Sequence, residues 1–171
     1  MKKLIFILTF LPGVLFGQLI TEVTFLKTSP DATVLPGINR TQTAIGWGAM
    51  FISGVAAGYK EVILHHYPQF KAKHPGANDL YFNPEVSWKN KYKNWYAGDT
   101  RARFPGSKTV LVGVTDFYHL TGIVDHSLLL AGTATIVIGQ KRKWYEYAIQ
   151  IGGGMLIRSA GFSLIYDVIY K

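Results

Sequence analysis

The sequence of 171 residues contains no cysteine. Disulfide bonds, thiol catalysis and cysteine–metal sites are therefore excluded. Acidic residues are also scarce, with ten Asp and Glu against eighteen Lys and Arg. The chain has no Gly-x-Ser-x-Gly, no phosphate-binding loop, no dinucleotide fingerprint and no His-Glu-x-x-His. It consequently carries none of the short sequence signatures of serine hydrolases, nucleotide-binding enzymes or zinc proteases.

The first seventeen residues predict a cleaved secretory signal. Lys2 and Lys3 precede an apolar run that is too short to span a bilayer, and Gly17 is a small residue suited to a cleavage point. An uncleaved first membrane helix is the alternative. We expect residues 18–171 to form one exported, membrane-associated domain, with residues 18–42 as a short extended arm. The expected location is the cell envelope, in the inner membrane or on its periplasmic face.

Three long apolar stretches indicate an all-α fold, a small bundle of three to four apolar helices. They predict helices over residues 42–67, 108–140 and 143–170. One helix over 108–140 would be about 50 Å long, well beyond a bilayer core, so we expect a break near Gly122. Gly54 and Gly58 form a small-xxx-small pair that allows another backbone to approach closely. The three glycines at 152–154 predict either a close contact or a kink.

Residues 68–107 predict a long aromatic and basic loop that acts as a lid. Interleaved Lys and aromatic residues are typical of a bilayer-interface belt, and a surface loop with its own small core is the alternative. The positive charge favours an anionic lipid surface over nucleic acid as the partner. The candidate substrate-binding residues, which would hold a phosphate or a carboxylate, are Trp88, Lys89, Lys91 and Arg103.

Two acid–histidine pairs flank this loop. Glu61 and His65 are four residues apart, and Asp116 and His119 are three apart. Antiparallel packing would bring the pairs to a similar depth, where they form a candidate acid–base catalytic site. With His126 on the same face, the five side chains form a candidate site for a divalent metal such as zinc, iron or manganese.

The alternative is purely structural. A buried Asp–His hydrogen bond and ion pairs would then fix the register of the helices, and no cofactor is expected. In that interpretation Arg158 neutralises Asp116 or Glu61.

Three strings within residues 54–121 resemble a family of small exported or membrane proteins of Bacteroidetes and their phages. They are residues 83–92 (NPEVSWKNKY), 103–107 (RFPGS) and 115–120 (TDFYHL). The resemblance implies no particular activity. It implies that the loop at 83–107 folds over the ends of the helices and covers Asp116 and His119.

Two functions follow as expectations. The first is a structural or interaction protein of the envelope, membrane-embedded or membrane-apposed. Its partners would be anionic lipid headgroups and either an envelope protein or a second copy of the chain. The second is a small membrane enzyme that acts on a lipid or lipid-linked substrate through the Asp/His/Glu set. No nucleic-acid partner is expected.

Overall fold

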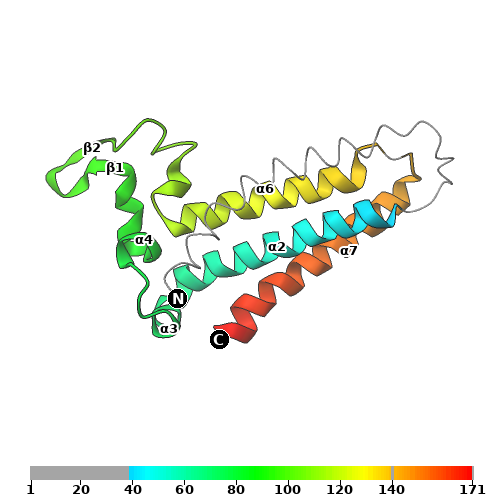
Figure 1. Ribbon diagram of the computed structural model, residues 1–171, viewed down its shortest axis with the longest axis horizontal. Coiled ribbons are helices and arrows are strands. Elements are labelled where there is room, and N and C mark those ends of the chain that lie inside the picture. Colours follow the sequence, from blue (N-terminus) through cyan, green and yellow to red (C-terminus); the bar gives the residue numbers. More distant parts are fainter. Residues whose placement is uncertain (1–38, 140, 171) are drawn as a thin grey trace. The chain divides into compact units, whose positions relative to one another are not determined.

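The computed structural model describes residues 39–139 and 141–170, and those residues are mostly helical (Figure 1). The predicted all-α class is confirmed at this level. The predicted signal and nearly all of the predicted arm lie outside the described residues. The end of that arm is an exception, because residues 40–42 already belong to the first long helix.

Helix α2 (Arg40–His65) has a hydrogen bond at each end to a backbone group that lacks a partner within the helix. The side chain of Asn39 accepts a hydrogen bond from the backbone N–H of Gln42 at 3.1 Å, which caps the first turn. At the other end, the backbone N–H of His66 donates to the carbonyl of Val62. The next helix, α3 (Tyr67–Lys73), starts at once with Pro68 in its first turn, where a missing N–H costs nothing.

Helix α6 (Phe117–Val137) runs without interruption through Gly122, so the predicted break there is wrong. The helix starts late because Asp116 caps it, with its carboxylate accepting from the backbone N–H of His119. Residues 108–116 instead form turns, including the 3₁₀ segment η3 (Val112–Val114). A Cβ at Gly122 would meet nothing within 4 Å, so this glycine costs only about 1 kcal/mol of helix propensity.

Helix α7 (Trp144–Ser163) also passes unbroken through its three glycines and continues as the π-helical segment η4 (Leu164–Ile169). Two of the glycines mark close contacts rather than a kink. A Cβ at Gly153 would lie 2.9 Å from the Trp47 ring, and one at Gly154 would overlap the Met50 side chain. The predicted close contact is therefore confirmed.

Helix α2 packs against both α6 and α7, which make much less contact with each other (Figure 1). Gly46 of α2 meets Gly132 of α6, whereas Gly54 of α2 meets Arg158 of α7. Because Gly46 meets a residue late in α6, α2 and α6 are antiparallel, and α2 and α7 run in the same direction. The basic triplet at residues 141–143 thus lies at the opposite end of α6 from the loop.

The glycines of α2 set how closely α7 approaches. A Cβ at Gly54 would overlap the backbone carbonyl of Arg158, and one at Gly58 would lie 2.8 Å from Cβ of Ile165. Both glycines of the predicted small-xxx-small pair therefore face a neighbouring helix. Close backbone approach of this kind is the usual role of such a pair between membrane helices.

Short elements fill the loop between α2 and α6. After α3 come α4 (Asp79–Phe82), α5 (Pro84–Ser87) and the 3₁₀ turn η1 (Trp88–Lys91). A hairpin follows, with β1 (Tyr92–Asn94) and β2 (Asp99–Ala102) joined through η2 (Trp95–Ala97). Gly98 closes it with φ 75°, a left-handed value that favours glycine. This hairpin was not predicted from the sequence.

Gly54 and Gly48 of α2 can be compared to test the close packing of α2 against α7. Replacing Gly54 with Ala should lower the free energy of unfolding by about 1–3 kcal/mol, because the added methyl overlaps the Arg158 carbonyl. Gly48→Ala is the matched control, since a Cβ there meets nothing within 4 Å. It should be neutral or stabilising by up to about 1 kcal/mol. Thermal melts of both variants check this, and equal melting shifts would contradict the packing.

Candidate functional site

Asp116 and His119 form a closely bonded pair at the start of α6. The imidazole Nδ1 lies 2.8 Å and 2.7 Å from the two carboxylate oxygens of Asp116. Asp116 is only 1% exposed, and it also accepts from the His119 backbone and the Thr115 hydroxyl. Because a carboxylate accepts, Nδ1 carries the proton. The neutral ring therefore has its lone pair on Nε2, the nitrogen that serves a general base or a metal ligand.

The loop packs on the beginning of α6, next to Asp116. Asn90 donates to the carbonyls of Thr115 and Leu80, which ties η1 to the residue before the cap. The Phe82 ring lies 4.9 Å from that of Phe117, centroid to centroid. Burial and the negative charge of Asp116 together raise the pKa of the Tyr81 phenol. These contacts come from residues 80–90, and the side chain of His119 stays 30% exposed.

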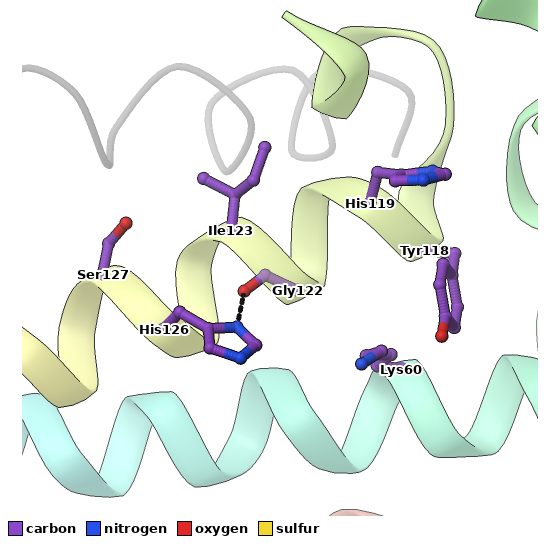
Figure 2. Close-up of a pocket in the computed structure, with 7 residues that line it drawn as sticks. All are labelled: Lys60, Tyr118, His119, Gly122, Ile123, His126 and Ser127. Atoms are coloured by element: carbon purple, nitrogen blue, oxygen red, sulfur yellow. Dashed lines mark hydrogen bonds between the residues drawn. The ribbon is translucent and has the colours of Figure 1, made fainter. Parts of the chain in front are cut away.

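His119 borders a pocket of about 400 Å³ on the surface of α6 (Figure 2). The other lining residues are Lys60 from α2, and Tyr118, Gly122, Ile123, His126 and Ser127 from α6. Figure 2 shows the His126 ring on the side of α6 that faces α2, with its Nδ1 bonded to the Gly122 carbonyl at 2.6 Å.

Glu61 and His65 belong to a different pocket. Their side chains approach to 3.3 Å, one helical turn apart on α2. They border a space of about 450 Å³ whose wall also includes Asp125 and Arg158. The predicted convergence with Asp116 and His119 is not seen, since those two residues are absent from this lining.

In the described ranges 39–139 and 141–170, no three or more His, Asp or Glu side chains come together as a metal-binding group. The five predicted ligands thus separate into the Glu61–His65 pair, the Asp116–His119 pair and His126, which is bonded to its own helix. The predicted single metal centre is not assembled. Catalytic roles for the two pairs stay predictions.

Arg158 pairs with Asp125, not with Asp116 or Glu61 as predicted. Its Nη2 donates to both carboxylate oxygens, at 3.0 Å and 3.2 Å, and its Nε donates to the Ser53 hydroxyl at 3.1 Å. The Ser53 hydroxyl in turn donates to Asp125 at 2.6 Å. One buried polar cluster therefore joins α2, α6 and α7, and we call Ser53, Asp125 and Arg158 the central trio.

A signal for this pair was present in the sequence. Asp125 lies sixteen residues before Lys141, and Arg158 lies fifteen residues after Lys143. The helices on either side of this turn run antiparallel, so residues that are equally far from the turn lie opposite each other along the helix axes. Residue type alone did not show which acidic residue would pair with Arg158. Counting residues from the turn in this way would have pointed to Asp125.

The four predicted substrate-binding residues lie in the loop and border neither pocket. Trp88 packs edge-to-face on Trp95 with centroids 4.5 Å apart. The ammonium groups of Lys89 and Lys91 each lie 5.9 Å from the centroid of the Trp88 ring, within cation–π range. Arg103 has an exposed side chain, and its backbone N–H is bonded to the Ser107 hydroxyl. The aromatic and basic residues thus form a small cluster of their own.

Comparison of the chain with protein-family models, curated proteins and solved structures finds no match. The resemblance to the Bacteroidetes and phage family accordingly stays a prediction.

Proposed function

We propose that this protein is an integral membrane protein of the bacterial envelope with a structural or interaction role. The observation that carries the proposal is the exposure of two apolar helices. The spans Phe117–Val137 and Trp144–Ile169 are long and apolar enough to cross a membrane, and only 22% of an apolar 18-residue stretch in each is buried within the chain. A core helix of a water-soluble protein would be mostly buried.

The exposed faces of these helices carry large aliphatic side chains. Leu130 is 72% exposed, Ile149 69%, Leu156 74% and Val168 73%. Large aliphatic side chains this exposed on long apolar helices are poorly suited to water. Lipid tails are the solvent that fits these side chains, so the proposal has α6 and α7 crossing the bilayer beside α2.

Aromatic residues near both ends of the span Trp144–Ile169 support this placement. Trp144 and Tyr145 lie at one end, next to the basic triplet, and Tyr166 lies at the other. Twenty-two residues separate Trp144 from Tyr166, which is about 33 Å of helix. That length is close to the hydrocarbon thickness of a bilayer, about 30 Å, and aromatic belts mark its two surfaces.

The central trio also suits a membrane interior. Charged side chains within spanning helices face other helices and pair with one another, because lipid cannot solvate them. Asp125 is 6% exposed and is matched by Arg158 and Ser53. In this proposal the trio fixes the packing of three helices. The aromatic and basic loop lies at the membrane surface, with anionic headgroups as its partners and an envelope protein or a second copy as a further partner.

Alkaline extraction of membranes that contain the protein tests the proposal. An integral protein stays in the pellet at high pH and is released only by detergent, and we expect this result. Leu130→Lys should reduce the pelleted fraction, because a lysine near the centre of a span costs about 2.5–3.5 kcal/mol. Thr109→Lys, in the exposed loop, is the control and should pellet normally. Release of the wild-type protein without detergent would refute the proposal.

A second candidate function rests on Asp116 and His119. A buried carboxylate that holds Nδ1 of a partly exposed imidazole leaves Nε2 as a base, and this ring borders an open pocket of about 400 Å³. The pair would act on a lipid or lipid-linked substrate at the membrane surface.

Replacing His119 with Gln separates this candidate from the structural one. An enzyme should lose turnover of an added lipid mixture, followed by mass spectrometry, by at least about 100-fold while it keeps its melting temperature. A structural pair should show no turnover in the wild type. Its His119→Gln variant should lose about 1–3 kcal/mol of stability, because Asp116 is left with an unmatched buried oxygen.

A further inference from the structure

The pocket in Figure 2 offers hydrogen-bond donors and no carboxylate. Its polar groups are the ammonium of Lys60, the imidazoles of His119 and His126, the Tyr118 phenol and the Ser127 hydroxyl. Ile123 and Gly122 provide an apolar wall. A ligand that fits this pocket would carry a negatively charged group next to an apolar group.

Lys60 has no acidic partner among the described residues. Its ammonium lies 5.0 Å from the centroid of the Tyr118 ring. Glu61, the next residue on the helix, is paired with His65, and adjacent residues on a helix do not face each other. Asp125 is occupied by Arg158. The positive charge of Lys60 is thus left for a ligand.

Both histidines of the pocket present the same nitrogen. Nδ1 of His119 donates to Asp116, and Nδ1 of His126 donates to the Gly122 carbonyl. In each ring Nε2 is therefore the nitrogen without a fixed partner.

The end of the pocket at Lys60 and Tyr118 lies at the depth of a lipid headgroup, if the helices span as proposed above. Lys60 lies five residues before the end of α2, about 7.5 Å along its axis, and Tyr118 is the second residue of α6. Tyrosine at a helix end marks the headgroup level of a bilayer. Phosphate is the anion that phospholipids present at that level.

We infer that the Lys60 end of this pocket binds the phosphate of an anionic phospholipid, with Lys60 as the charge partner. His119 and His126 are seven residues apart, about 10 Å along α6, too far to hold one small ion together. A phosphate with its glycerol backbone is long enough to lie along this face, with Ile123 beside the start of the acyl chains. The inference rests on the proposed function, because a soluble protein would not meet this ligand.

Native mass spectrometry of the full-length protein in detergent tests this inference, with added phosphatidylglycerol or the net-neutral phosphatidylcholine. The wild type should retain one phosphatidylglycerol in preference to phosphatidylcholine. Lys60→Gln should weaken retention about tenfold, the expected loss of one charge-assisted hydrogen bond, and Lys60→Arg should keep it. Lys93→Gln, on the exposed hairpin, is the matched control and should bind as the wild type does.

Equal retention of both lipids, or retention unchanged in Lys60→Gln, would overturn the inference. Inorganic phosphate that displaces the lipid at millimolar concentration would overturn the assignment to a lipid in favour of a free anion. If Lys60→Gln does not fold, Lys60→Met is the second variant, and it should weaken retention to a similar extent. The two proposals fail in different experiments. If the protein is not integral to the membrane, alkaline extraction releases it, whereas a wrong lipid assignment shows only in the lipid preference.

Discussion

The charged and hydroxyl side chains of the central trio are the interaction on which the rest of the structure depends. Ser53, Asp125 and Arg158 come from three different helices, and each contacts the other two. Away from water, such a cluster is stabilising only when every member is matched. It therefore admits one register of α2 against α6 and α7, and it links α6 to α7, which otherwise make little contact with each other.

Glycine makes this arrangement sterically accessible. Gly54 follows Ser53 directly, and its missing side chain lets the backbone of Arg158 lie against α2. The guanidinium then reaches back to the Ser53 hydroxyl and across to Asp125. The dense glycine of α2 and α7, which would weaken a helix in water by about 1 kcal/mol per site, is here the condition for pairing. The close packing at Gly54 and the charge pairing of the trio thus occur at the same position along the three helices.

Local features were predictable from the sequence, and the features that depend on register were not. The extent of α2, the close contacts at Gly54 and Gly58, and the Asp116–His119 contact all follow from spacings of three or four residues within one helix. The predicted break at Gly122 was wrong because residues 108–116 were counted as helix. With Asp116 as the cap, α6 has 21 residues and fits a bilayer without a break.

The separation of the two acid–histidine pairs required tertiary structure, and the partner of Arg158 required the register of the last two helices, counted from the turn between them. Periodicity gives the face of a residue on its own helix, but it does not give the level at which two helices meet. Two acidic residues near or in the same predicted helix, Asp116 and Asp125, were both candidates for a basic residue on the last helix. The hairpin at residues 92–102 was missed for another reason, because three- and four-residue strands leave too short a pattern to read.

A double-mutant cycle on Asp125 and Arg158 tests the central claim most directly, with unfolding followed in detergent micelles. Arg158→Gln should destabilise the protein by about 3–5 kcal/mol, since it leaves the buried Asp125 carboxylate unmatched. Asp125→Asn should cost less, because the Arg158 side chain that it leaves unmatched is 27% exposed. The double variant should lose clearly less than the sum of the two, because neither charge remains. Asp167→Asn, at an exposed position of η4, should change little. Small and additive losses for the two single variants would contradict the account.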